Sequence, residues 1–261
     1  MNGLLFVGIL CLALISYRLR LLTGDGALAS VLVGGGILLG THLNGLLLLA
    51  FFFVSSSFFS KVKKHQKKQA EEIVEKGSTR DAWQVVANGF GATIFSVLYY
   101  LNDNEILLYG FILSLAIATS DTWASELGVL SSKRPIHIRT LKRVDRGTSG
   151  AISIYGTIMA LLGSLSVAIL AKLLFSISFV IVGILTILGF IGCMIDTILG
   201  AYFQVSYYCT VCHKRVEKNV HCNKETIEPI GRKWVTNDFV NFTSTVGFSI
   251  VVITLWYYIL H

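Results

Sequence analysis

Three aspartates lie within long apolar segments of this chain, where a charged side chain is energetically unfavourable. Asp121 occurs in SDTWASELG, Asp196 in MIDTILGAYFQV and Asp238 in VTNDFVN. A charged side chain in the hydrocarbon core of a membrane costs roughly 2.5–3.5 kcal/mol or more. Three acids at one depth repel one another unless a cation joins them. We therefore predict that they are catalytic residues that bind Mg²⁺, which prefers oxygen ligands.

Amides, hydroxyls and a fourth acid accompany the aspartates. Gly192, Asp196, Gly200 and Gln204 recur every four residues and define a stripe that a ligand or another helix can approach. Polar residues also hold membrane helices together, so contacts between helices are the alternative. The fourth acid, Glu126, is a catalytic candidate that orients an acceptor or binds a cationic side chain. The candidate phosphate-binding or coordinating residues are Asn88, Thr122, Ser125, Gln204, Asn237 and Asn241.

The loop RPIHIRTLKRVDRGTSGAIS (134–153) has the composition of a phosphate-binding segment. Five basic residues precede GTSG, and small residues at the start of a helix expose N–H groups where the helix dipole favours anions. The loop lacks the G-x-x-x-x-G-K-[ST] pattern of the Walker loop. An ordinary basic loop that only orients a membrane protein is the alternative. The candidates for phosphate binding are Arg143, Arg146, Gly147, Thr148, Ser149, Gly150 and Ser153.

The segment CTVCHKRVEKNVHC resembles a small structural zinc site. Cys209 and Cys212 form a C-x2-C pair, Cys222 follows, and either His221 or His213 supplies the fourth ligand. Such ligands close a loop that is too short to fold alone. We therefore predict a structural Zn²⁺ in this loop, although a second C-x-x-C pair is missing.

The elements that must position these residues are membrane-spanning helices. The chain has 261 residues, of which 54% are hydrophobic and 14% charged, against about a quarter charged in soluble domains. Its mean hydropathy is +0.68. We predict an all-α, polytopic transmembrane bundle that forms a single integral membrane domain, with short helices in its cytoplasmic loops. The predicted helices, eight in number or seven if the second and third are one bent helix, are 3–17, 27–41, 44–60, 83–101, 106–128, 150–171, 176–201 and 236–259.

The basic residues predict the orientation of the bundle. All Lys and Arg residues except Lys172 fall in four loops, 18–26, 61–82, 129–149 and 202–235, which share one side if eight helices are counted. Because basic loops stay in the cytoplasm, we predict a multi-pass protein of the cell membrane with both termini outside. The net charge of +7 is then a topology signal, and we expect no nucleic-acid partner. We expect the basic helix at 61–82 to be solvated or to face lipid headgroups, without a catalytic role.

This topology brings the polar residues to one depth. Asp121, Asp196, Asp238 and Asn88 lie near the cytoplasmic ends of four different predicted helices. The outer halves of these helices contain no charged residue, so chemistry at one face fits better than transport across the membrane. We therefore predict an active site that faces the cytoplasm.

Several motifs, taken together, resemble those of a known membrane-protein family. GSTRDAWQVVANG, SDTWASELG, DRGTSGAIS, IDTILGAYFQ and TNDFVN resemble an integral-membrane family of bacteria and archaea related to the plastid phytyl-phosphate kinases. The resemblance covers about residues 22–245, with the motifs in the same order. It implies transfer of the terminal phosphate of a nucleoside triphosphate, CTP or ATP, to a prenyl or phytyl monophosphate. No plastid transit segment is visible, so we expect a plasma membrane of the bacterial type.

Phosphoryl transfer also fits the residues themselves. It requires a divalent cation and cationic groups around the phosphates, and an anionic acceptor needs no strong base. We expect Arg143, Arg146 and the GTSG amides to stabilise the transferred phosphate while the aspartates hold Mg²⁺. One alternative is another CTP-dependent lipid enzyme, either a cytidylyltransferase or a lipid-alcohol kinase. The other is a transporter or flippase of a phosphorylated lipid or small anion.

Overall fold

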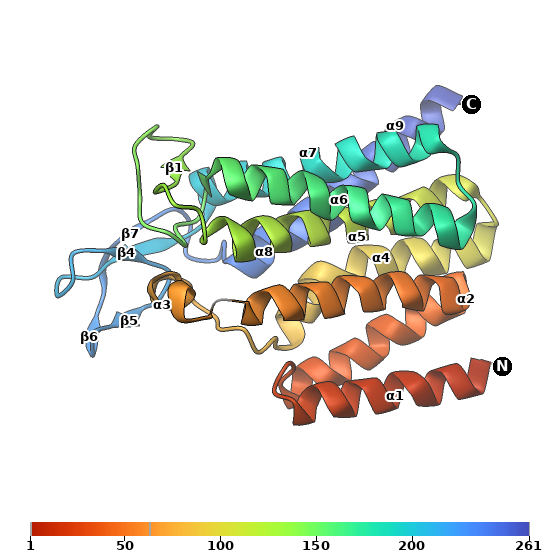
Figure 1. Cartoon of the computed structure of the whole chain (residues 1–261), viewed down its shortest axis with the longest axis horizontal. Helices are drawn as coiled ribbons and strands as arrows, with labels where there is room; N and C mark the ends of the chain where they lie inside the picture. The colour runs from red at the N-terminus through yellow and green to blue at the C-terminus, as the bar shows by residue number, and fades with distance from the viewer. Residues whose placement is uncertain (1, 63, 261) are drawn as a thin grey trace.

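Helices dominate the computed structural model, which describes residues 2–62 and 64–260. Six of the described helical segments are long and apolar enough to cross a membrane, and they pack side by side (Figure 1). The predicted all-α, polytopic bundle is therefore confirmed. The helices are α1 (Asn2–Arg18), α2 (Gly24–Lys61), α3 (Lys64–Ile73), α4 (Ala82–Asn102), α5 (Glu105–Gly128), α6 (Ile154–Phe175), α7 (Phe179–Phe203), α8 (Asn237–Phe242) and α9 (Phe248–Leu260), with a π-helical turn, η1 (Thr243–Gly247), before the last.

The helix α2 reverses direction in its middle. Its 38 residues would extend about 57 Å if straight, yet Arg80 contacts both ends. The Thr23 N–H donates to the Arg80 carbonyl at 3.0 Å, and the Arg80 guanidinium donates to Ser57 Oγ at 3.2 Å. His42, with φ 51° and ψ −144°, breaks the helix between two arms that run in opposite directions (Figure 1). The two predicted spans on either side of His42 are therefore separate helical arms.

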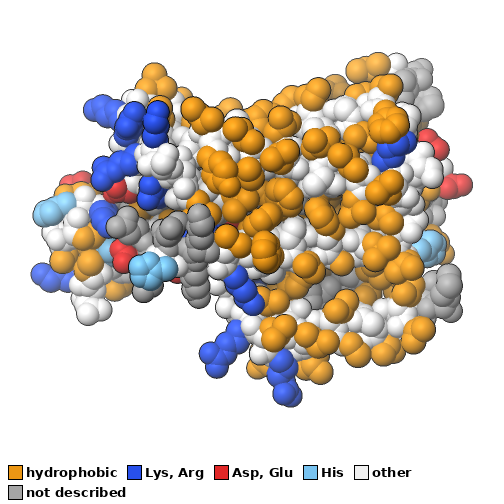
Figure 2. Space-filling view, viewed as in Figure 1, with side chains coloured by type: hydrophobic (Ala, Val, Ile, Leu, Met, Phe, Trp, Pro, Cys, Tyr) orange, Lys and Arg blue, Asp and Glu red, His pale blue; other side chains and the backbone are white. Residues whose placement is uncertain are grey.

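The helix α5 forms the centre of the bundle. Every side chain from Phe111 to Ser120 is buried. The outer helices, in contrast, expose apolar side chains, many of them on the face shown in Figure 2. Small residues let neighbouring helices approach α5, and a Cβ on Gly163 of α6 would lie only 3.0 Å from the Thr119 carbonyl. The polar residues that follow Ser120 are thus carried by a tightly packed helix.

The basic loops gather at one end of the molecule, opposite the start of α1 and the end of α9 (Figures 1 and 2). We expected short helices in these loops, and α3 is one. The later loops carry short antiparallel strands instead, in three small sheets ordered β1-β2, β4-β3-β7 and β5-β6. The strands are β1 (Ile136–His137), β2 (Ala151–Ile152), β3 (Ser206–Tyr208), β4 (Arg215–Val216), β5 (Val220–His221), β6 (Lys224–Glu225) and β7 (Ile227–Ile230). We call residues 206–234 the β-cap.

The π-helical turn η1 interrupts the last membrane segment. The Phe248 N–H bonds to the Thr243 carbonyl, five residues back. Thr245 Oγ1 donates to the Ala87 carbonyl of α4 at 2.8 Å and to the Asn241 carbonyl at 2.7 Å. This turn therefore fastens α8 to α4 near the basic end of the bundle.

Candidate functional site

A cavity of about 320 Å³ lies at the basic end, where α3, α4, α5, α7 and α8 meet the loop between β1 and β2. Among the residues predicted for catalysis or phosphate binding, Arg143 and Gln204 are the two outside its lining. The predicted residues that line the cavity are Asn88, Asp121, Thr122, Ser125, Glu126, Arg146, Gly147, Thr148, Ser149, Gly150, Ser153, Asp196, Asn237, Asp238 and Asn241. Segments far apart in the sequence thus build one polar cavity.

Asp196, on α7, is held by the last membrane segment. Its Oδ2 accepts a hydrogen bond from Ser244 Oγ at 2.8 Å. With the Asn241 amide oriented so that its nitrogen faces this carboxylate, that nitrogen donates to the same oxygen at 3.1 Å. Asp196 is only 7% exposed. Among the described residues no group donates to Oδ1, so this oxygen is available to a ligand.

Asp121, on α5, faces the same cavity without a protein partner. In the part of the chain that the structure describes, no group donates a hydrogen bond to its carboxylate and no basic side chain pairs with it. The charges of Asp121 and Asp196 repel each other. Two neighbouring carboxylates, of which Asp196 is buried, are unfavourable unless a cation lies between them. The pair therefore fits a divalent cation.

Two lysines from the segment that includes α3 also line the cavity, which the sequence analysis missed. Lys67 Nζ lies 2.6 Å from Glu126 Oε2, and Lys67 is 3% exposed. Lys76 pairs with Asp81 at 2.7 Å and with Asp238. The expectation that this segment is solvated or faces headgroups is therefore wrong at Lys67. Of the two roles expected for Glu126, the structure shows the binding of a cationic side chain.

Two arginines complete the basic part of the lining, Arg80 and Arg146. Arg146 Nη2 donates to the Ser131 carbonyl at 2.8 Å, whereas its buried Nε has no partner within the described residues. Arg143 is exposed and outside the lining. Because a buried donor without an acceptor is costly, Arg146 is the stronger candidate for binding an anion.

The GTSG segment lines the cavity, but the prediction that it begins a helix is wrong. Strand β2 follows Gly150, and α6 begins only at Ile154, with Ser153 as its N-cap. The Ser153 hydroxyl accepts a hydrogen bond from an N–H in the first turn of α6 and so stabilises its own helix. Gly147 and Gly150 have φ angles of +89° and +72°, and a Cβ on Gly150 would lie 2.4 Å from Ala201 Cα. Glycine is therefore required for this tight loop.

Gln204 links the wall of the cavity to the β-cap. Ser149 Oγ donates to Gln204 Oε1 at 2.7 Å, and Gln204 Nε2 donates to Glu217 Oε1 at 2.7 Å. Glu217 Oε2 accepts from the Glu75 backbone N–H at 3.2 Å. Burial raises the pKa of the Glu217 carboxyl to about 7. The structure thus places Gln204 as a connector beside the cavity.

We expect the Tm of Glu217→Gln relative to the wild type to rise as the pH increases from 5 to 8, by about 2–4 °C for each kcal/mol of unfolding free energy. At every pH the glutamine amide loses one of the two hydrogen bonds that the carboxyl oxygens accept, so the prediction concerns the pH dependence of the difference. An unfolded glutamate ionises near pH 4.5, whereas Glu217 in the folded protein stays protonated until about pH 7. The raised pKa therefore lowers stability as the pH rises from about 4.5 to about 7, and glutamine removes that loss. Thermal unfolding in detergent from pH 5 to pH 8 measures it, with exposed Glu225→Gln as the control. A difference that does not vary with pH would contradict the assignment.

The predicted zinc ligands come together outside the cavity lining. One ligand atom from each of Cys209, Cys212, His221 and Cys222 lies within 4.8 Å of all the others. His213 Nδ1 instead lies 2.9 Å from the Tyr208 hydroxyl. Of the two histidines left open by the sequence, His221 is the one that joins the cysteines.

The sequence analysis assigned no role in the site to several lining residues, among them Lys67, Lys76, Arg80 and Glu217. Lys67 pairs with an acid 59 residues away, and Lys76 pairs with Asp238, 162 residues away, in addition to the nearby Asp81. Arg80 had an available signal, because it directly precedes Asp81, the N-cap of α4. Glu217 had none, since it lies among charged residues of an exposed loop.

Known proteins similar to this chain are integral membrane proteins. Residues 7–249 match the family described as "Integral membrane protein DUF92". The "Uncharacterized membrane protein MJ0933" of Methanocaldococcus jannaschii is 36% identical over 223 residues, which cover 84% of this chain and 88% of that protein.

Plant proteins are also similar. "Protein PGR" of Arabidopsis thaliana is 30% identical over 210 residues, covering 70% of this chain and 71% of that protein. "Protein VTE6, chloroplastic" of the same plant is 29% identical over 203 residues, covering 76% of this chain and 54% of that protein. No solved structure matches the chain.

Proposed function

Because this chain belongs to the integral membrane protein family DUF92, as the sequence motifs predicted, we propose that it is a membrane-embedded isoprenyl-phosphate kinase. In this proposal it transfers the terminal phosphate of a nucleoside triphosphate, CTP or ATP, to a prenyl or phytyl monophosphate. The basic end of the bundle faces the cytoplasm, where the nucleotide is available. The resemblance of the motifs to those of the plastid phytyl-phosphate kinases, together with the similarity to a chloroplastic plant protein, supports the choice of a prenyl or phytyl acceptor.

The observation that carries the proposal is the composition of one cavity. Asp121 and Asp196 present carboxylate oxygens without donors among the described residues, and Lys67, Lys76 and Arg146 line the same space. Carboxylates alone fit a metal site and cations alone fit an anion site. Together they fit a phosphate chain that carries its own divalent cation.

The lining fits Mg²⁺ through hard oxygen ligands. We assign Asp121 and Asp196 as ligands, with the amide oxygen of Asn88, whose nitrogen donates to the Gln84 carbonyl at 2.9 Å. Asp238, which the sequence analysis also assigned to the metal, already pairs with Lys76, a lysine that also contacts Asp81. We assign it instead to holding that lysine at the cavity. When bound, Mg²⁺ neutralises charge on the phosphate oxygens as the leaving group departs.

The chain's own residues then serve to bind and orient two anionic reactants. An oxygen of the lipid phosphate forms a bond to the terminal phosphorus of the nucleotide. The bond from that phosphorus to its bridging oxygen breaks, and the nucleoside diphosphate leaves with the electron pair. Arg146, whose buried Nε has no partner among the described residues, offsets the repulsion between the reactants and stabilises the transferred group. No side chain needs to remove a proton, because the attacking phosphate oxygen is already ionised.

The position of the cavity suits a lipid acceptor. The cavity is lined by residues at the ends of candidate membrane-spanning helices. On the face shown in Figure 2 the side chains of the bundle are largely apolar. A prenyl chain can therefore remain among lipids and helices while its phosphate enters the polar site. A water-soluble acceptor would gain nothing from this placement.

A phosphate-transfer assay on purified protein in detergent tests the proposal. The reactions contain Mg²⁺, CTP or ATP labelled in the terminal phosphate, and phytyl, geranylgeranyl or farnesyl monophosphate, or in parallel reactions the corresponding alcohols. A labelled prenyl diphosphate is the expected product, and its yield identifies the preferred donor and acceptor. Release of pyrophosphate would indicate a cytidylyltransferase, and labelling of a prenyl alcohol alone would indicate a lipid-alcohol kinase. Lipid movement in proteoliposomes without nucleotide consumption would indicate a flippase.

A further inference from the structure

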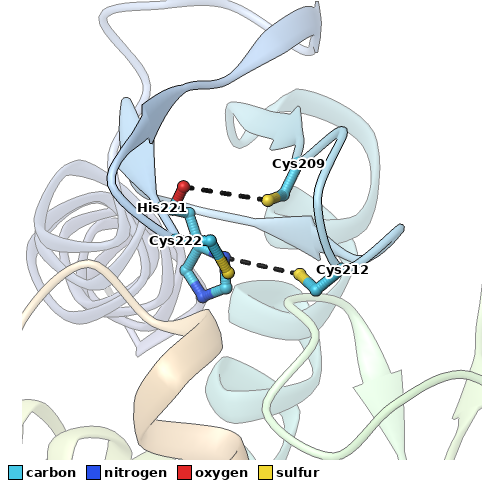
Figure 3. A group of neighbouring side chains, drawn as sticks. All are labelled: Cys209, Cys212, His221 and Cys222. Atoms are coloured by element: carbon cyan, nitrogen blue, oxygen red, sulfur yellow. Dashed lines mark hydrogen bonds between the residues drawn. The ribbon is translucent and has the colours of Figure 1, made fainter.

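The cluster of Cys209, Cys212, His221 and Cys222 is a second polar centre, separate from the kinase cavity and its lining (Figure 3). Two tight turns of the β-cap bring it together. Cys209 and Cys212 flank the turn between β3 and β4, where the His213 N–H bonds to the Cys209 carbonyl at 3.0 Å. His221 and Cys222 lie at the tip of the β5–β6 hairpin, where Cys222 has a φ of 51°. Each of the two turns thus positions two of the four ligand side chains.

The distances fit a tetrahedral metal site. Nδ1 of His221 lies 3.4 Å from Cys212 Sγ and 3.3 Å from Cys222 Sγ, and all four ligand atoms lie within 4.8 Å of one another. A tetrahedral zinc with bonds of about 2.0–2.3 Å holds its ligand atoms about 3.3–3.8 Å apart. Three thiols and one imidazole are soft and borderline ligands, the set that zinc prefers over Mg²⁺.

The β-cap needs such a metal because it has almost no apolar core. Across residues 206–234, all of which the structure describes, Cys209 and Val216 are the two buried residues. Its strands are two to four residues long, and every residue of β6 and β7 is exposed to solvent. A segment of this size without an apolar core requires a cross-link, such as a bound metal ion or disulfide bonds, to fold stably.

We propose that Cys209, Cys212, His221 and Cys222 bind one structural Zn²⁺ that folds the β-cap and fastens it over the wall of the cavity. The link to the wall is Glu217, directly after β4. Its N–H donates to the Ile73 carbonyl at the end of α3 at 2.8 Å, and its carboxylate accepts from Gln204. Zinc therefore stabilises the position of α3, which carries Lys67.

Metal analysis of the purified full-length protein tests this inference. We expect one zinc per chain by inductively coupled plasma mass spectrometry, and less than about one tenth of that in Cys212→Ser and His221→Ala. Two matched changes should keep the metal: His213→Ala, in the same turn, and Cys11→Ser, an exposed cysteine on α1. Loss of zinc in the control variants, or its retention in His221→Ala, would overturn the ligand assignment.

The wild-type protein provides a test that does not depend on the folding of variants. Protein produced with cobalt in place of zinc should show the visible absorption of tetrahedral cobalt(II) with thiolate ligands. Wild-type protein that contains no zinc, contains iron instead, or shows a disulfide among these cysteines would overturn the proposal. Because metal content is measured without substrate, this result is independent of whether the chain is a kinase.

Discussion

Asp121→Asn is expected to lower the rate of phosphate transfer by about 100- to 1000-fold while leaving the protein folded. Asparagine keeps the size of the side chain but removes the negative charge that attracts the divalent cation. Within the described chain no donor or basic group depends on this carboxylate, so the substitution breaks no internal contact. The transfer assay across a range of Mg²⁺ concentrations measures the loss.

Asp103→Asn is the matched control for this prediction. Asp103 is exposed at the opposite end of the bundle and ends α4 in a left-handed conformation, which asparagine also adopts readily. Its turnover should stay within about twofold of the wild type, a margin of less than about 0.5 kcal/mol. Full activity in Asp121→Asn, with a normal elution profile and Tm, would remove Asp121 from the metal site.

Arg146→Ala is expected to lower kcat/KM by about 100-fold, because it removes a fixed cation from the phosphate end of the cavity. The guanidinium is held by the Ser131 carbonyl, so its position is set before the substrate arrives. Its buried Nε, which lacks a partner within the described residues, is expected to donate to a phosphate oxygen in the complex. Arg146→Lys should recover only part of the rate, since lysine lacks the planar guanidinium.

Arg143→Ala separates this structural prediction from the sequence-based one. The sequence treats Arg143 and Arg146 alike, as members of one basic loop, whereas Arg143 is exposed and outside the cavity lining. We expect its removal to change kcat/KM by less than about threefold, a loss of under about 0.7 kcal/mol. If Arg143→Ala loses as much activity as Arg146→Ala, the loop rather than the cavity governs phosphate binding.

The membrane-spanning helices and the depth of the polar residues could be predicted from sequence, because both follow from local composition. Long apolar runs predict helices, and the distribution of basic residues predicts which helix ends meet. That reasoning brought Asp121, Asp196 and Asn241 together from three separate segments, and all three line one cavity. It could not show that Ser244 holds Asp196, since serines in apolar helices usually bond to their own backbone.

The basic half of the cavity could not be predicted in the same way. Lys67 belongs to a run of lysines after an apolar helix. Such a pattern usually indicates only how the helix is oriented in the membrane. Its burial depends on how α3 packs against Glu126, far away in the sequence. The start of α6 was placed too early because GTSG and the apolar residues after it form one small-residue run. Ser153, three residues before Gly156, was the better signal for the first turn of that helix.

The π-helical turn η1 has a consequence for how the last membrane segment is built. Such a turn accommodates one more residue than an α-helix does in the same rise, so it rotates everything before it by about 100° relative to everything after it. The face of α8 that carries Asn241 and the lipid-facing side of α9 are therefore offset from where one continuous α-helix would put them, so that Asn241 lies toward Asp196 while the exposed side chains of α9 remain largely apolar.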